Sequence, residues 1–118
     1  MTTYAILLPG DEAAWAAADA AEKARMYGLH DQFSQALEQR GHKVVGGAEL
    51  VHSSQARTVR GTSDNVMVTE GPYAETVEQL TGFYLVESDD VDDLAKICGI
   101  ISGGEPIEIR ACVPPPSS

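Results

Sequence analysis

The alternation of strand-like and helix-like segments is the feature that most constrains the fold of this chain. Short apolar or alternating runs predict strands at residues 4–8, 43–51, 57–61, 66–69, 81–87 and 105–113. An alanine-rich segment and two runs of helical periodicity predict helices over residues 11–24, 22–40 and 90–101. The segments 11–24 and 22–40 overlap and count as one long helix. The order along the chain is therefore strand, long helix, strand, hairpin, strand, helix and strand.

Without the hairpin, this order is the βαββαβ pattern of a ferredoxin-like α+β domain. Two helices would pack on one face of an antiparallel sheet, and no further helical segment remains to cover the other face. We therefore expect a homodimer in which a second subunit covers that face. The domain is expected to span residues 1–113, and the proline-rich residues 114–118 are expected to form a disordered tail.

The composition excludes several classes of partner. The chain has 8 basic and 18 acidic residues, a formal charge of −10. Such a surface repels phosphate backbones and anionic lipids, so we expect neither nucleic-acid nor membrane binding. No apolar run is long enough to span a bilayer, and residues 1–9 lack the basic residues of a signal peptide, which favours a cytoplasmic protein. Cys98 and Cys112 lie in apolar surroundings and are expected to be buried free thiols.

Residues 69–84 carry the most distinctive sequence of the chain. They read TEGPYAETVEQLTGFY, in which a Gly-Pro turn and three carboxylates lead into an apolar strand. This segment resembles the TDGPFAETKEQLGGF signature of the YCII-related, or DGPF-domain, family. Residues 10–15, 46–50 and 107–110 resemble further segments of that family, so the similarity extends over roughly residues 1–113.

The resemblance implies a fold, an assembly and a regulatory context. Members of the family have a ferredoxin-like domain that forms a dimeric α/β barrel, and they often accompany extracytoplasmic-function sigma factors. This chain departs from the family pattern at Glu70, Tyr73, Val77, Thr81 and Ala111. The change at Val77 removes a lysine from between two glutamates, which alters any anion site in that loop.

His30 is the sharpest candidate for acid–base chemistry, because an imidazole changes charge near neutral pH. It lies eleven residues before Gly41, the spacing at which some members of the family carry a proposed catalytic histidine. In those members an aspartate near the end of the last helix partners the histidine. Residues 96–101 of this chain contain no acid, so that pair is incomplete.

Two interpretations of His30 remain open. As a catalytic group, it would need another carboxylate as its partner, and the candidates are Glu70, Glu75 and Asp31. Alternatively, His30 is a core or pocket-rim residue on a helix face that it shares with Met26, Phe33 and Leu37.

The carboxylates Glu70, Glu75 and Glu78 have three possible roles. They could form a general acid–base pair, supply oxygen ligands to a hard cation, or accept backbone N–H bonds that hold the loop. The three histidines of the chain have no zinc-ligand spacing, which argues against a metal site. Loop scaffolding and pocket lining are equally compatible with the sequence.

The Gly71-Pro72 turn and two tyrosines complete the predicted site. Glycine and proline fix a tight turn, and no phosphate-loop motif occurs. Tyr73 and Tyr84 could place hydroxyls in a cavity, although strand aromatics also pack in cores and interfaces. The candidate ligand-binding residues are therefore Tyr84, Tyr73, Gly71 and Pro72, with no metal and no cofactor.

Two functions are compatible with this sequence. The first is a non-catalytic, dimeric protein that binds a small molecule or acts as a regulatory accessory. The second is a cofactor-free lyase, isomerase or dehydrochlorinase in which His30 is the acid–base group and Glu70, Glu75 and Tyr84 shape the pocket. Because the aspartate of the histidine pair is missing, the sequence favours the first.

Overall fold

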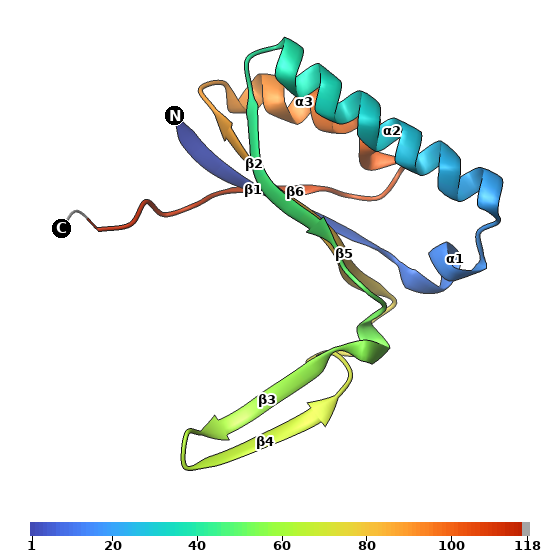
Figure 1. Ribbon diagram of the computed structural model, residues 1–118, viewed down its shortest axis with the longest axis vertical. Coiled ribbons are helices and arrows are strands. Elements are labelled where there is room, and N and C mark those ends of the chain that lie inside the picture. Colours follow the sequence, from blue (N-terminus) through green and yellow to red (C-terminus); the bar gives the residue numbers. More distant parts are fainter. Residues whose placement is uncertain (117–118) are drawn as a thin grey trace.

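A computed structural model describes residues 1–116 of the chain (Figure 1). Within this range the strands are β1 (Thr2–Asp11), β2 (Lys43–Glu49), β3 (Arg57–Thr62), β4 (Asn65–Glu70), β5 (Glu78–Ser88) and β6 (Glu108–Ala111), and the helices are α1 (Glu12–Ala17), α2 (Ala20–Gln39) and α3 (Val91–Ser102). In the predicted tail, residues 114–116 are exposed and have no regular secondary structure, while 117 and 118 lie outside the described residues.

Four strands form an antiparallel sheet in the order β2-β5-β1-β6, and β3 and β4 form a separate hairpin. Helices α2 and α3 lie side by side on one face of the sheet, and the hairpin projects away from it (Figure 1). The predicted α+β class is confirmed, and both hairpin strands lie within one residue of their predicted limits. Among the described helices, none has the length and apolarity needed to cross a membrane.

The alanine-rich helix predicted over residues 11–24 is wrong in one respect, because it is interrupted. Ala18 has extended backbone, with ψ of 141°, and Asp19 accepts a hydrogen bond of 2.8 Å from the backbone N–H of Glu22. Asp19 thereby begins α2, as Asp11 begins α1 by accepting from the backbone N–H of Ala14. Two aspartate caps therefore divide the segment into two helices.

The limits of the predicted sheet strands also differ from the structure. β1 spans Thr2–Asp11 rather than 4–8, and β2 ends at Glu49 rather than at 51. β5 begins at Glu78, three residues earlier than predicted, because its first residues pair with Gly10 and Asp11 of β1. β6 begins at Glu108, three residues later than predicted, since Gly103 and Gly104 turn the chain with φ of 51° and 88° after α3. Positive φ is the backbone region that glycine adopts without strain.

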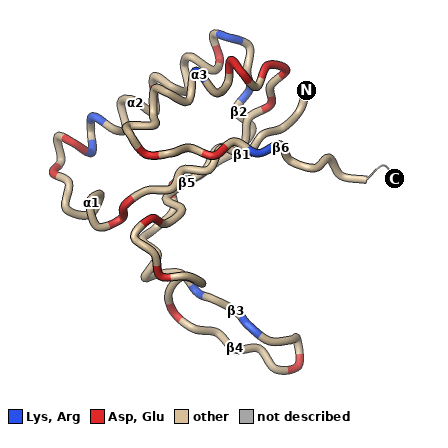
Figure 2. The backbone as a smooth tube through the Cα atoms, turned by 180° about the vertical axis from the view of Figure 1, so that it is seen from behind, with Lys and Arg blue, Asp and Glu red and all other residues tan. Residues whose placement is uncertain are grey.

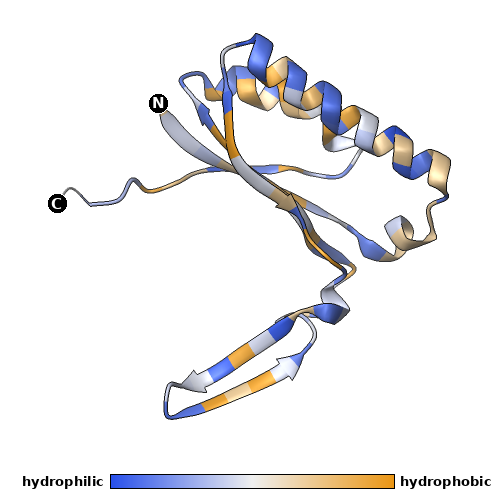
Figure 3. Cartoon of the chain, viewed as in Figure 1, coloured by the Kyte–Doolittle hydropathy of each residue, from blue (hydrophilic) through white to orange (hydrophobic). Residues whose placement is uncertain are grey.

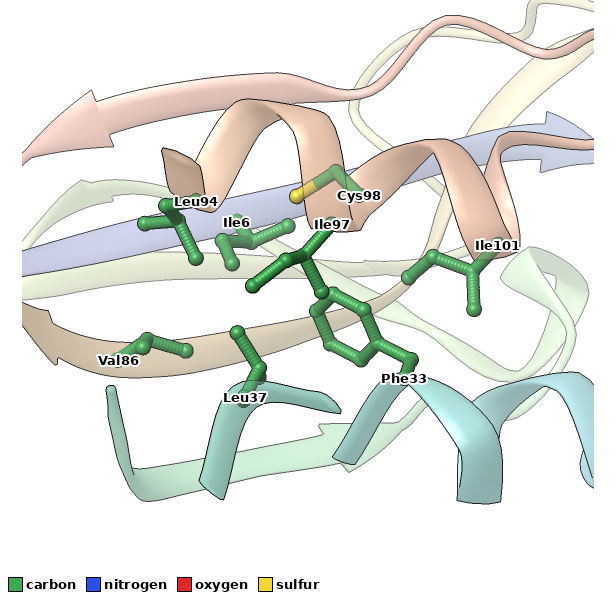
Figure 4. Close-up of a cluster of buried hydrophobic side chains, with 8 residues drawn as sticks. All are labelled: Ile6, Phe33, Leu37, Val86, Leu94, Ile97, Cys98 and Ile101. Atoms are coloured by element: carbon green, nitrogen blue, oxygen red, sulfur yellow. The ribbon is translucent and has the colours of Figure 1, made fainter. Parts of the chain in front are cut away.

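The core lies between α2, α3 and the covered face of the sheet (Figure 4). Its buried members are Ile6, Phe33, Leu37, Val86, Leu94, Ile97, Cys98 and Ile101. Burial raises the pKa of the Cys98 thiol to about 11, so it is an inert core residue, as predicted. Cys112 is also a free thiol but is only half-buried, which corrects the prediction for that residue.

A buried polar cluster that was not predicted from the sequence lies where β5 ends beside α3. The imidazole of His42 is hydrogen-bonded to Ser88 Oγ and to Asp93 Oδ2, each at 2.8 Å, and so joins β5 to α3. Ser88 Oγ also accepts a bond of 3.0 Å from the backbone N–H of Asp90. Although these residue types occur in hydrolases, only 1% of Ser88 and 7% of His42 is exposed, so the cluster has a structural role.

Candidate functional site

A cavity of about 600 Å³ lies where β1, β2 and β5 meet helices α1 and α2. The aromatic residues Trp15, Tyr27 and Tyr84 contribute to its walls, together with apolar residues of β1 and α3. A smaller cavity of about 350 Å³ adjoins it and shares Trp15 among its walls. The larger volume is in the range of sites that hold small organic ligands.

His30 projects from α2 into this cavity and contacts Tyr84 of β5. Its Nδ1 and the Tyr84 hydroxyl share a hydrogen bond of 2.7 Å, and the two rings are nearly parallel. Phe33 packs against the same tyrosine ring, with centroids 5.0 Å apart. His30 is therefore a pocket residue that is held in place by a phenol.

The surroundings of His30 and Tyr84 keep both groups uncharged at neutral pH. Burial lowers the pKa of the His30 imidazole, and the negative charges of Glu49 and Asp31 only oppose this shift. Burial also raises the pKa of the Tyr84 phenol, with a smaller contribution from Asp31. When the imidazole proton is on Nε2, the hydroxyl can donate to Nδ1. In the other tautomer the proton is on Nδ1 and is donated to the hydroxyl oxygen, so Nε2 is unprotonated and can act as a neutral base.

A second pair of polar residues, Tyr27 and Glu49, lies at the wall between α2 and β2. The Tyr27 hydroxyl donates to both carboxylate oxygens of Glu49, at 2.8 and 3.0 Å. This hydrogen bond, followed by burial, raises the pKa of the phenol. The ring of Trp15 meets the Tyr27 ring edge to face at 5.7 Å, so the carboxylate is joined to an aromatic wall.

The charges around the cavity are mainly negative. One guanidinium, that of Arg25, is among the lining groups, and it is held by two hydrogen bonds of 2.7 and 3.0 Å to the carboxylate of Glu22. The remaining lining carboxylates are those of Asp11, Glu49 and Glu105. Because Arg25 is already neutralised, these acids disfavour an anionic ligand.

The signature loop, which joins β4 to β5, and the last residue of β4 hold the other predicted site residues, and these lie outside the cavity. Glu70, Tyr73 and Glu75 are exposed, and Gly71 and Pro72 are half-buried at the base of the hairpin, whereas none of the five is among the residues that line the cavity. Of the predicted site, the structure brings together His30 and Tyr84. The other predicted site residues lie beside the hairpin, whereas residues 78–84 of the signature belong to β5.

The hydrogen bonds of this loop come from neutral groups. In the part of the chain that the structure describes, the side-chain amide of Gln79 donates to the carbonyls of Ala74 and Thr76, at 2.9 and 3.2 Å. Thr58 donates to the carbonyl of Gly71 at 2.8 Å, and Gly71 has a φ of 102°. The loop is therefore scaffolded by an amide, a hydroxyl and a glycine turn rather than by the predicted carboxylates. Over residues 1–116, no three metal-ligating side chains form a cluster.

Comparison with known proteins identifies a relative over most of the chain. No family model matches the chain. The chain is 31% identical over 103 residues to the Uncharacterized protein R00369 of Rhizobium meliloti (strain 1021), and the aligned segment covers 87% of this chain and 82% of that protein. The chain therefore belongs to the same family as this Rhizobium protein.

Proposed function

We propose that this chain is a YCII-related protein that binds a small molecule and is not itself an enzyme. The observation that carries the proposal is the aromatic-walled cavity of about 600 Å³ between the sheet and helices α1 and α2. Its walls are mainly apolar, and the pairs His30–Tyr84 and Tyr27–Glu49 are already oriented by hydrogen bonds, which is typical of ligand sites. A binding or regulatory accessory role needs no more than this arrangement.

The family and fold assignments are part of the proposal. The sequence at residues 69–84 supports the YCII-related family. The strand order β2-β5-β1-β6 supports a ferredoxin-like domain, because two interleaved βαβ units produce this order once the hairpin is left out. Two free cysteines suit a reducing compartment, so the proposed location is the cytoplasm.

The proposed assembly is a homodimer whose sheets pack face to face. Leu7 pairs with Phe83 and Ala5 pairs with Leu85 on the strand positions that alternate with buried core residues. These side chains therefore share the face opposite α2 and α3, and they are partly exposed. A second subunit would cover this apolar face as the helices cover the other.

The ligand class follows from the walls of the cavity. Aromatic rings favour a flat apolar group, and they also attract cations through their π faces. Within residues 1–116 the lining carboxylates of Asp11, Glu49 and Glu105 form no ion pair, so they favour a neutral or cationic ligand over an anion. Glu49 accepts hydrogen bonds from Tyr27, which forms the aromatic wall with Trp15. The proposed ligand is therefore a small aromatic molecule with a neutral or cationic polar group.

Isothermal titration calorimetry with three matched naphthalenes tests this proposal. We expect 1-naphthylmethylammonium and 1-naphthylmethanol to bind, and 1-naphthoate to bind at least about tenfold more weakly, a difference of about 1.4 kcal/mol. Glu49→Gln should reduce the preference for the cation without abolishing the binding of the alcohol. Equal or tighter binding of the naphthoate, or no binding of any probe, would contradict the proposal.

The second candidate function, a cofactor-free acid–base enzyme, is favoured by one observation. His30 opens into the cavity and is held by Tyr84 at 2.7 Å, with its pKa lowered by burial so that the neutral base is present at pH 7. Such a base could remove a proton from carbon in a lyase or isomerase reaction.

Elimination of 5-nitrobenzisoxazole tests this second function, since a base removes the ring C–H proton as the N–O bond breaks, giving a nitrile and a phenolate. This second function predicts a rate that His30→Gln lowers by about 100-fold, whereas His52→Gln, in the wall of the smaller cavity and not of this one, leaves it unchanged. The active form of the base is unprotonated and its pKa is lowered, so the rate should rise with pH and reach half its maximum below about pH 6.5. A rate independent of His30 would leave only the binding function.

A further inference from the structure

The hairpin formed by β3 and β4, here called the arm, has almost no contact with the rest of its own chain. Every residue of β4 is exposed, and in β3 all but Thr58 are exposed. The chain has a radius of gyration of 16.5 Å, compared with about 13.5 Å for a compact domain of this length. Within residues 1–116 the arm has no packing partner, and an isolated two-stranded hairpin is only marginally stable in water.

One face of the arm is apolar. Val59 is directly opposite Val68, and Val66 lies two residues before Val68, so the three side chains share a face. Their exposed fractions are 62%, 55% and 52%. Figure 3 shows apolar residues along both strands of the arm, and these strands are exposed within residues 1–116.

The arm, residues 57–70, has two arginines and two acids, Asp64 and Glu70, and is therefore neutral, whereas the remaining chain is strongly acidic. β3 carries Arg57 and Arg60 and no acid (Figure 2), and neither arginine forms an ion pair within residues 1–116. The residues outside the arm comprise 6 basic and 16 acidic side chains. Another copy of this chain therefore presents an acidic surface that suits Arg57, the arginine on the valine face, which lies opposite Glu70 without an ion pair to it.

We infer that the valine face of the arm docks on a second copy of this chain. The inference rests on the proposed homodimer and adds a second contact to it, since the open sheet face and the arm are separate surfaces. The valines supply apolar contact area, and Arg57, on the same face as Val59, pairs with acids of the second copy. The arm thus contacts the second copy outside the interface between the two sheets.

Sedimentation equilibrium of matched variants tests the inference. Val68→Glu places a carboxylate on the valine face and should weaken dimerisation by about tenfold or more. Met67→Glu is the matched control, because Met67 is 56% exposed, Val68 is 55% exposed, and Met67 lies on the opposite face of the same strand. The control should dimerise like the wild type, and both variants should keep the wild-type circular dichroism spectrum.

The other outcomes separate the inference from the proposed homodimer. A dimer that Val68→Glu leaves unchanged, or that both substitutions weaken alike, would overturn the docking of the valine face. If wild type and Val68→Glu are both monomeric at micromolar concentration, the homodimer and the arm contact fail together. If Leu85→Glu leaves the dimer intact while Val68→Glu disrupts it, the arm contact stands and the sheet-face packing fails.

Discussion

Phe33→Ala is expected to lower the free energy of unfolding by about 3–5 kcal/mol, the usual cost of removing a buried phenylalanine. Phe33 is 0% exposed and joins the core of α2 and α3 to the ring of Tyr84, 5.0 Å away. Truncation therefore leaves a void beneath the cavity wall as well as a loss of apolar burial. A domain of this size has a total stability of about 5–15 kcal/mol, so a large part of it would be lost.

Urea denaturation followed by far-UV circular dichroism measures this effect. Gln32→Ala is the control, because Gln32 is the neighbouring residue on α2 and is exposed; its change should remain within about 0.5 kcal/mol. A loss below about 1 kcal/mol for Phe33→Ala would mean that the core does not include this side chain as described.

Ala14→Phe is expected to reduce the affinity for 1-naphthylmethanol by at least about tenfold, because the new ring would fill part of the ligand volume. Ala14 lies on α1 and lines the cavity of about 600 Å³. The residue is exposed, so the larger side chain enters the cavity without displacing the core, and the free energy of unfolding should change little.

The neighbouring substitution Ala13→Phe provides the matched control. Ala13 is also exposed on α1 but is not among the residues that line the cavity. Titration calorimetry should therefore give the wild-type affinity for Ala13→Phe and the weakened affinity for Ala14→Phe. Equal affinities in the two variants would place the ligand elsewhere on the molecule.

The elements of this fold were predictable because their signals are local. The hairpin limits, the helix-face residues Phe33 and Leu37, and the turn at Gly41, which has a φ of 85°, all follow from patterns within a few residues. The break between α1 and α2 was missed, because alanine favours a continuous helix and the competing cap at Asp19 is a single side chain.

The site was predictable only in part, because its members are distant in the sequence. His30 and Tyr84 are 54 residues apart, and both were candidates for reasons of residue type. Tyr27 and Glu49 were not, since the hydrogen bond between them depends on how α2 crosses β2. The signature loop was a candidate site because its sequence is distinctive, but its residues lie at the base of the hairpin.

The central claim is that the aromatic-walled cavity binds a small aromatic molecule. Methyl NMR tests this claim most directly. Met26 lines the cavity, whereas Met67 lies on the arm, so the two methyl groups report on different surfaces of one protein. During a titration with 1-naphthylmethanol, we expect the Met26 methyl resonance and the indole N–H of Trp15 to shift saturably while Met67 remains unchanged. A saturable shift confined to Met67, or no saturable shift at Met26, would contradict the account.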